Sequence, residues 1–268
     1  MSLAGVTLEG RYTVIRPIAR GAVATVYLAL DLQGTPYALK IFPKGYEGRA
    51  DREYKVGELL QHPRINPVLE RLTVPHEGLE KPAVLMAYAP GTRLSEWRRD
   101  NLTQGLKVFG ELLEALAHMH THGLVHRDVK PDNLMVDREG QARLLDFDLS
   151  GPSHEPFKQP VRLGTIAYLS PEQVGGQSPT PASDVYSVGI LFHWVVSGEL
   201  PYQGEPAEVM AAHLRQPMPE LIPQPGTGIV ASRALLEYAA RMTAKNPAER
   251  FANAEEALRV FRLLRTEG

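Results

Sequence analysis

The most informative stretch of the 268-residue sequence is HRDVKPDNLMVDREGQARLLDF, residues 126–147. Within it, two apolar runs, residues 134–136 and 142–145, are joined by the turn-forming sequence DREG, which predicts a β-hairpin. Because the strands of a hairpin are antiparallel, the residue before the first strand and the residue after the second lie at the same end of the ladder. Asn133 and Asp146 hold these two positions, so we expect two oxygen ligands to meet there.

The residues before this hairpin form a polar loop that proline interrupts, unlike a segment of the core. Asp128 and Lys130 lie in this loop, shortly ahead of Asn133. A carboxylate that can act as a base, a lysine and a metal ligand are therefore expected to converge.

The composition predicts a folded globular chain and argues against several kinds of partner. The chain is 43% hydrophobic and 22% charged, so it is neither disordered nor collagen-like. Its formal net charge is −2 and it has no polybasic block, so binding to nucleic acid or to an anionic membrane surface is not expected. It contains no cysteine, which excludes disulfides, thiolate zinc sites and cysteine nucleophiles.

The hydropathy pattern indicates no membrane segment. The longest apolar stretch, residues 185–196, is shorter than the ~20 residues of a membrane-spanning helix and is interrupted by Tyr186, Ser187 and His193. We expect this stretch to form a buried helix. The N-terminus does not resemble a signal peptide, so a cytoplasmic location is expected.

Apolar periodicity predicts a small sheet lobe followed by a larger helical lobe. Strands are expected over residues 12–18, 24–30, 36–42 and 83–88, with one helix over residues 52–60. Farther along, helices are expected around residues 106–119 and 185–195 and over residues 206–214, 229–244 and 254–264, with a proline-rich loop over residues 216–228. The two lobes are expected to comprise residues 1–88 and 89–268, with a hinge at about residues 87–92.

Several short motifs occur along the chain in a recognisable order: Tyr37-Ala38-Leu39-Lys40, His126-Arg127-Asp128 with Lys130 and Asn133, Asp146-Phe147, Ser170-Pro171-Glu172, Asp184 and Arg250. With these motifs in this order, the chain resembles a eukaryotic-type Ser/Thr protein kinase, and the bacterial members of that family in particular. The resemblance covers nearly the whole chain and implies an α+β, bilobal protein kinase-like fold over residues 1–268. Its N-lobe would be a small antiparallel β-sheet with one main helix, and its C-lobe would be larger and mainly helical.

The resemblance implies that the chain is a non-specific serine/threonine protein kinase, which transfers the γ-phosphoryl group of Mg-ATP to protein hydroxyls and autophosphorylates. Asp128 would orient the substrate hydroxyl and accept its proton, and Lys130 would neutralise the charge that develops on the transferred group. Lys130 also favours serine or threonine over tyrosine as the substrate residue, as does Thr165.

Binding of the nucleotide and the metal ion follows from the same resemblance. Lys40 would contact the α- and β-phosphates and be held by Glu53. Asn133 and Asp146 would bind Mg²⁺, with Mn²⁺ as an alternative cation. The residues implied to contact or position the nucleotide are Ala19, Gly21, Val26, Ala38, Lys40, Glu53, Met86, Ala87, Tyr88, Ala89, Met135 and Leu145.

Three further residues are expected to hold the C-lobe together. Glu172 and Arg250 would form a buried salt bridge, for which a bidentate arginine suits a carboxylate better than lysine does. Asp184 resembles the aspartate that fixes the backbone of the catalytic loop; it could equally cap the start of its own helix, and both roles can hold at once.

The sequence departs from the kinase pattern at two places near the nucleotide. The glycine-rich loop keeps only Gly21 of three expected glycines, with Ala19 and Ala24 in place of the others, and is expected to be stiffer. Asp148 replaces the glycine that follows Asp146-Phe147. A solvent-facing or locally hydrogen-bonded Asp148 is favoured over an extra metal ligand.

The sequence does not decide whether phosphorylation orders the segment 149–163. Ser150 and Ser153 are candidates for phosphorylation that would pair with Arg127, and Glu155 could instead supply a standing negative charge. The run His118-Met119-His120-Thr121-His122 is expected to end a helix rather than to bind zinc.

Two other kinds of protein remain as alternatives to an active kinase. A pseudokinase would use the fold as a nucleotide-binding scaffold or regulator, but Lys40, Asp128, Asn133 and Asp146 are all present. A small-molecule kinase of related fold is disfavoured because Ser170-Pro171-Glu172 resembles the peptide-positioning part of protein kinases. The sequence does not indicate the protein substrate or the oligomeric state.

Overall fold

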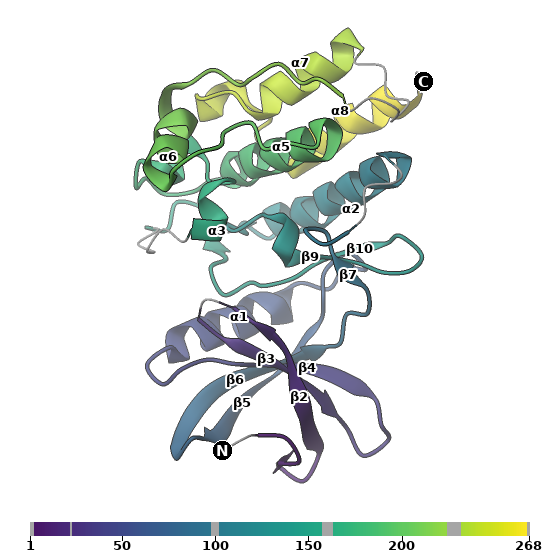
Figure 1. The fold of residues 1–268 in the computed structure, drawn as a ribbon, viewed down its shortest axis with the longest axis vertical. Helices are drawn as coiled ribbons and strands as arrows, with labels where there is room; N and C mark the ends of the chain where they lie inside the picture. The colour runs from purple at the N-terminus through teal and green to yellow at the C-terminus, as the bar shows by residue number, and fades with distance from the viewer. Residues whose placement is uncertain (1–2, 22, 98–101, 157–162, 224–231, 267–268) are drawn as a thin grey trace. The chain divides into compact units, whose positions relative to one another are not determined.

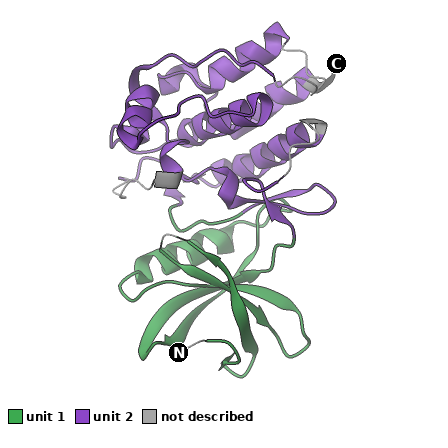
Figure 2. Ribbon diagram, in the orientation of Figure 1, with its two compact units in different colours: residues 1–90, 145–149 green, residues 91–144, 150–268 purple. Residues whose placement is uncertain are grey.

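The computed structural model of the chain describes residues 3–21, 23–97, 102–156, 163–223 and 232–266. Contacts divide the chain into two compact units, which Figure 2 shows in green and purple. Unit 1 comprises Met1–Pro90 and Leu145–Leu149, and unit 2 comprises Gly91–Leu144 and Ser150–Gly268. The sequence-based division assigns everything after residue 88 to the second lobe, whereas Leu145–Leu149 groups with unit 1.

The described part of unit 1 is a six-stranded antiparallel sheet with one helix, α1 (Figure 1). The strand order is β1-β2-β3-β4-β6-β5, so β1 and β5 are the edges. The bounds are β1 Thr7–Leu8, β2 Tyr12–Arg20, β3 Thr25–Leu30, β4 Pro36–Ile41, α1 Glu47–Leu59, β5 Val68–His76 and β6 Leu79–Ala87.

The register of the central strands decides which side chains share a face of this sheet. Val26 pairs with Lys40, and Ala38 pairs with Met86. Since paired residues and alternate residues of a strand lie on one face, these four side chains point to the same side. Leu39 points to the other side, where it belongs to a separate apolar cluster. Both faces of β4 are therefore buried.

The sequence analysis missed one long strand of unit 1 and began its helix too late. Strand β5 contains Arg71 and Pro75, which obscure its alternating pattern; proline is tolerated because β5 is an edge strand. Helix α1 begins at Glu47 rather than near residue 52, and the residue before it, Tyr46, gives no side-chain cap. Without a capping residue, the sequence carries no clear start signal.

Unit 2 is mainly helical, with short strands near its N-terminal end (Figure 1). A membrane-spanning helix is not found among the described residues. Two stretches of unit 2 lie outside the described residues: 157–162, which belong to the segment 149–163, and 224–231, which include the end of the expected loop 216–228 and the start of the expected helix 229–244. The bounds are β7 Thr92–Arg93, α2 Leu102–Thr121, β8 Leu124–Val125, η1 Pro131–Asn133, β9 Leu134–Val136, β10 Ala142–Leu144, β11 Gly151–Pro152, α3 Leu163–Ile166, α4 Pro171–Val174, α5 Pro181–Ser197, α6 Pro206–Arg215, α7 Arg233–Met242, η2 Pro247–Glu249 and α8 Ala254–Thr266.

The β-hairpin expected after the catalytic loop is present as strands β9 and β10. Their register pairs Leu134 with Leu144, so Asn133 directly precedes the paired residues. Asp137 closes the turn through its side chain, which accepts a hydrogen bond from the backbone N–H of Gln141 at 2.8 Å. Gly140 adopts a φ of 68° in this turn, a conformation that favours glycine.

The apolar stretch of residues 185–196 forms the buried helix α5, as expected. Its side chains with no exposed surface include those of Tyr186, Leu191 and Phe192. The centre of the Phe192 ring lies 4.6 Å from the centre of the Phe109 ring of α2. Helix α5 ends at Gly198, which adopts a φ of 84°. This helix is thus the core of unit 2, and its first turn is placed to support polar loops.

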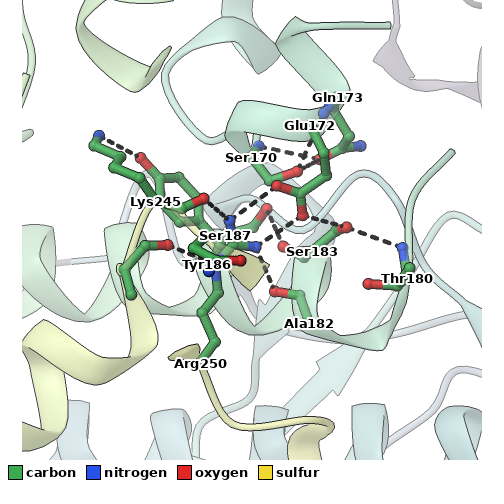
Figure 3. A network of polar contacts seen from close by, with 12 residues as sticks. Ser170, Glu172, Gln173, Thr180, Ala182, Ser183, Tyr186, Ser187, Lys245 and Arg250 are labelled. Carbon is green, nitrogen blue, oxygen red and sulfur yellow. Dashed lines mark hydrogen bonds and ion pairs between the residues drawn. The ribbon is translucent and has the colours of Figure 1, made fainter. Parts of the chain in front are cut away.

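Figure 3 shows the polar network that ties α4 to α5 and to the segment after α7. Arg250 donates from Nη1 and Nη2 to the two carboxylate oxygens of Glu172, at 2.7 and 2.9 Å. Ser183 donates a third hydrogen bond to Glu172 at 2.6 Å, and Arg250 also donates to the carbonyl of Ala182. The Arg250 side chain is fully buried, so the expected buried bidentate bridge is present.

The network changes the ionisation of Glu172. Burial opposes ionisation of its carboxyl group, but hydrogen bonds from Arg250 and Ser183 outweigh burial and hold the pKa below its ordinary value of 4.5. A lowered pKa in the folded state stabilises the fold at every pH above the unfolded pKa, and this contribution is lost as the pH falls through the folded pKa.

Removing Arg250 should therefore destabilise the protein strongly. Arg250→Met leaves Glu172 buried without its cation, and we expect the free energy of unfolding at pH 7 to fall by about 3–5 kcal/mol. Urea denaturation measures this change. The difference from wild type should shrink as the pH falls below 4.5 and through the lower folded pKa of Glu172, because the carboxyl group is then protonated in both proteins.

The matched control is Arg233→Gln, which removes an exposed arginine that pairs with Glu237 on one face of α7. Because water screens this exposed ion pair, its loss should change the free energy of unfolding very little. Equal effects of Arg250→Met and Arg233→Gln would contradict the structural role of the buried bridge.

A second prediction concerns Gly57, where α1 approaches β5. A Cβ atom on Gly57 would lie 2.3 Å from Cγ2 of Val68. Alanine in a helix usually stabilises relative to glycine by about 1 kcal/mol. At this position the clash should reverse the sign, and Gly57→Ala should destabilise by about 1–3 kcal/mol.

Thermal or urea unfolding tests this reversal, with Gly48→Ala in the same helix as the control. A Cβ on Gly48 meets nothing within 4 Å, so that variant should be neutral or more stable. A stabilising Gly57→Ala would show that α1 and β5 are not packed this closely.

Candidate functional site

The charged part of the site in unit 1 is built around Lys40 of β4. Its Nζ lies 2.7 Å from Oε2 of Glu53 in α1 and 2.8 Å from Oδ1 of Asp146. The Lys40 side chain is 9% exposed and that of Glu53 is 1% exposed. Strand β4, helix α1 and the segment Leu145–Leu149 therefore bring together three residues that the sequence analysis assigned to nucleotide and metal binding.

Burial would by itself lower the pKa of the Lys40 ammonium group, but the charges of Asp146 and Glu53 outweigh burial and raise it. Burial and the neighbouring aspartates raise the pKa of Glu53, against the opposing effect of Lys40. Lys40 is thus held as a cation among carboxylates, which suits it to bind an anionic group such as a phosphate.

Asp146 combines an unusual backbone with an accessible side chain. Its φ is 67°, a conformation that costs energy for a residue other than glycine and that is often found at functional sites. Its side chain is 34% exposed, unlike the buried Lys40 and Glu53. A carboxylate with this exposure can still accept a hard cation.

An apolar surface lies on the same face of the sheet as Lys40. Ala38 and Met86 are buried in one cluster with Ala24, and Val26 packs against it. After β6 the chain continues through Tyr88 and Ala89, which are half-buried. The amide of Asn66 donates to the carbonyl of Ala87 at 3.0 Å, which fixes the end of the strand.

The loop between β2 and β3 is compatible with its alanines. Ala19 pairs with Val26 in the strand ladder, and the N–H of Gly21 donates to the carbonyl of Ala24 at 2.8 Å. Neither Ala19 nor Ala24 has a positive φ, so the missing glycines leave no backbone strain at these two positions. Residue 22 lies outside the described part of the loop.

The charged part of the site in unit 2 is built around Asp128. Nζ of Lys130 lies 2.8 Å from Oδ2 of Asp128, and Thr165 Oγ1 donates to Oδ1 at 3.2 Å. Lys130 also donates to Oγ1 of Thr165 at 3.0 Å. The Asp128 side chain is 5% exposed, so an ordered carboxylate and an ammonium group share one small site.

Asn133 completes this group and leaves one oxygen for a ligand. Its amide nitrogen donates to the backbone carbonyl of Asp128 at 2.8 Å and to Oδ2 at 3.1 Å. Because the amide nitrogen of Asn133 makes both of its hydrogen bonds to Asp128, the amide oxygen is the atom that can coordinate a cation.

The described residues contain no group of three or more histidine, cysteine or acidic side chains placed to hold a metal ion by themselves. Magnesium fits this donor chemistry, since it is usually bound by one or two protein oxygens together with phosphates and water. Asn133 belongs to unit 2 and Asp146 to unit 1, so each is described within its own unit. The same holds for two residues that the family resemblance implies to contact the nucleotide: Met135, which is half-buried on β9 of unit 2, and Leu145 of unit 1.

The backbone of the catalytic loop is held by Asp184 of α5. Its carboxylate accepts hydrogen bonds from the N–H groups of His126 and Arg127 at 2.7 and 2.8 Å, and Nε2 of His120 lies 3.0 Å away. Burial opposes ionisation of Asp184, but these contacts outweigh it and lower the pKa. Arg127 has a φ of 71°, a strained conformation that the two hydrogen bonds help to fix.

The contacts of His120 with Asp184 and Ala254 were not predicted from the sequence. The ring joins Asp184 to α8, because its Nδ1 accepts a hydrogen bond from the N–H of Ala254 at 3.0 Å. His118 and His122 instead face each other, with ring centroids 4.5 Å apart. The spacing of four residues explains why His118 and His122 are neighbours on one face of α2. The contacts of His120 depend on residues far away in the sequence.

Arg127 has an acidic partner without phosphorylation. Its Nη1 lies 3.0 Å from Oε2 of Glu155, and its Nη2 donates to the carbonyl of Pro152. The side chain of Arg127 is 2% exposed. Ser150 is fully buried and donates to the carbonyl of His126 at 3.2 Å, so a kinase cannot reach it in this conformation.

The sequence analysis favoured a solvent-facing or a locally hydrogen-bonded Asp148 over a metal ligand. The Asp148 side chain is 6% exposed, so the solvent-facing orientation is wrong. Oδ2 is 3.4 Å from Nη1 of Arg49 and 3.8 Å from Nζ of Lys40. No local pattern indicated Arg49, because the pair joins residues that are distant in the sequence.

Comparison with known proteins agrees with these features. The model of the protein kinase domain family matches residues 12–260. Serine/threonine-protein kinase PrkC of Bacillus subtilis is 30% identical over 95% of this chain and 40% of its own length. Serine/threonine-protein kinase PknA of Mycobacterium tuberculosis is 33% identical over 96% of this chain and 63% of its own length. A probable serine/threonine-protein kinase PknB of Lactococcus lactis is 28% identical over 95% of this chain and 42% of its own length.

The chain thus spans between two fifths and two thirds of the length of these relatives. The match includes strands β2 to β6 of unit 1, and in unit 2 the loop that carries Asp128 and the Glu172–Arg250 bridge. An antiparallel sheet with one helix followed by a mainly helical unit is the α+β fold expected of this family. The chain belongs to the protein kinase domain family.

Proposed function

We propose that this chain is an ATP-dependent serine/threonine protein kinase that transfers the γ-phosphoryl group of Mg-ATP to hydroxyl groups of proteins, its own included. The observation that carries the proposal is the buried arrangement of Lys130, Asn133 and Thr165 around the carboxylate of Asp128. Asp128 sits in a loop, where a buried carboxylate with three side-chain contacts has no evident role in the core.

In unit 1, we assign nucleotide binding to Lys40. Its ammonium group, held by Glu53, would contact the α- and β-phosphates. Gly21 and Ala19 would approach the phosphates through their backbone. The apolar surface of Val26, Ala38 and Met86, together with Met135, Leu145 and the backbone of residues 87–89, would contact the adenine ring.

In unit 2, we assign the proton transfer to Asp128. Its carboxylate would orient the substrate hydroxyl group and accept its proton. Lys130, 2.8 Å from Asp128, would stabilise the negative charge on the transferred group. Thr165 bonds to both residues, and this arrangement supports serine and threonine rather than tyrosine as the substrate residues.

A divalent cation is part of the chemistry of the family, and we propose Mg²⁺, with Mn²⁺ as an alternative. The amide oxygen of Asn133 and the carboxylate of Asp146 would hold it. When bound, the cation neutralises the phosphate charge and orients the γ-phosphoryl group. Oxygen ligands are those that these hard cations prefer.

A pseudokinase has no observation in its favour. The relatives are named as kinases, and Lys40, Asp128, Asn133 and Asp146 are all present. We also propose that the domain acts in the cytoplasm, where ATP is available, and without nucleic acid as a partner, since the net charge is −2.

Substitution of the proposed base gives the first functional prediction. Asp128→Asn keeps the shape of the side chain but cannot accept the proton, and kcat should fall by about 10²–10⁴ with a smaller change in KM for ATP. Transfer of radiolabelled γ-phosphate to a generic basic protein measures this effect.

Asp132→Asn in the same loop is the control. The carboxylate of Asp132 accepts a hydrogen bond from Ser95 instead of taking part in the group around Asp128, so this variant should keep nearly wild-type kcat. If Asp128→Asn were as active as wild type, Asp128 would not be the base.

The second functional prediction concerns the partner of Arg127. Because Glu155 already pairs with this buried guanidinium, Ser153→Ala should leave kcat unchanged within about twofold. Glu155→Gln should lower kcat by about tenfold, the size of one charge-assisted hydrogen bond. Steady-state kinetics and phosphopeptide mapping of the same samples check both variants.

Glu139→Gln, in the exposed turn between β9 and β10, is the control for loss of one carboxylate. An activity that depends on phosphate at Ser153 and is indifferent to Glu155→Gln would contradict this account.

A further inference from the structure

Asp148 is a buried carboxylate to which the kinase mechanism gives no role. It stands where the family resemblance leads us to expect glycine, yet its side chain is 6% exposed. Its Oδ2 accepts a hydrogen bond from Nη1 of Arg49 at 3.4 Å and lies 3.8 Å from Nζ of Lys40. A buried acidic side chain requires compensation, and here the nearest cations lie on two different elements of unit 1.

Arg49 lies on α1, four residues before Glu53. Residues with this spacing lie on the same face of a helix. Arg49 faces Asp148 while Glu53 faces Lys40, so the helix makes two ion pairs of opposite polarity. The Arg49 side chain is 12% exposed, and its guanidinium lies 5.8 Å from the centre of the Tyr46 ring. Arg49 is thus partly enclosed rather than a free surface charge.

The number of carboxylates near Lys40 explains why a second cation, Arg49, lies beside Asp148. Around Lys40 stand three carboxylates, those of Glu53, Asp146 and Asp148. With glycine at position 148, Lys40 would face two of them. The third carboxylate adds repulsion against Glu53 and Asp146. Lys40 already faces the other two carboxylates, and the guanidinium of Arg49 adds a second positive charge that helps to offset Asp148. The same pair joins α1 to Leu145–Leu149, the segment that carries Asp146.

We propose that Arg49 and Asp148 form an ion-pair latch that holds helix α1 against the metal-binding segment, so that Glu53 stays paired with Lys40 before nucleotide binds. Arg49 and Asp148 are then positioning residues, which act through Glu53 and Lys40. The kinetic part of this inference rests on the proposed kinase function, whereas the latch itself does not.

Four proteins form a double-mutant cycle that tests the latch: wild type, Arg49→Gln, Asp148→Asn and the double variant. The first readout is hydrogen exchange of the α1 backbone amides without nucleotide, which does not depend on activity. The second is steady-state kinetics, with KM for ATP, kcat and the magnesium concentration at half-maximal rate measured separately.

If the latch exists, each single variant should exchange its α1 amides about five to ten times faster than wild type, as expected for loss of one charge-assisted hydrogen bond. The double variant should exchange no faster than the single ones, because the same interaction is lost. KM for ATP should rise in parallel, and Arg49→Lys should restore part of both effects. Lys55→Gln removes an exposed cation from the same helix and should change neither readout.

Three results would overturn the proposal. Unchanged exchange in both single variants would mean that the pair does not hold α1. Additive effects in the double variant would mean that the two side chains act independently. A higher magnesium requirement in Asp148→Asn alone, with Arg49→Gln like wild type, would make Asp148 a metal ligand instead. Absence of kinase activity in every protein would refute the proposed function but leave the exchange result to decide the latch.

Discussion

The buried ammonium group of Lys40 is the constraint on which the organisation of unit 1 depends. A buried charge is unfavourable unless opposite charges compensate it. Lys40 meets this requirement through Glu53 and Asp146, which come from α1 and from a segment more than a hundred residues later in the chain. The sheet, the helix and Leu145–Leu149 are therefore joined by one group of charges. This explains why a five-residue segment packs with a unit that is otherwise complete at Pro90.

In unit 2, the buried charges that require compensation are carboxylates rather than an ammonium group. There the buried groups that need partners are the carboxylates of Asp184 and Glu172, and α5 supplies or supports both. Asp184 holds two N–H groups of the catalytic loop, while Glu172 is held by Arg250. Because α5 is buried along most of its length, these polar contacts are made to a well-packed helix. The loop that carries Arg127 and Asp128 can then keep the strained conformation of Arg127.

The sequence predicted elements whose signal is local, and failed where the cause is a distant partner. Strands β2, β3 and β4, the hairpin of β9 and β10 and helix α5 follow from short-range patterns of apolar and turn residues. Strand β5 was not predicted, because it contains Pro75, which an edge strand tolerates. The start of α1 was placed too late, because Tyr46 provides no side-chain cap. The partners of Asp148 and His120 could not be found in this way, since each depends on a contact across the fold.

The family follows from motifs and from similarity over most of the chain, but catalysis depends on whether Lys40 and Asp128 act together on one nucleotide. The most direct measurement is transfer of γ-phosphate from labelled Mg-ATP to a generic basic protein, followed by phosphoamino-acid analysis, for wild type and Lys40→Met. The account predicts phosphoserine and phosphothreonine without phosphotyrosine for wild type, and loss of transfer in the variant. Nucleotide binding with no transfer above the Lys40→Met background would contradict it and identify a pseudokinase.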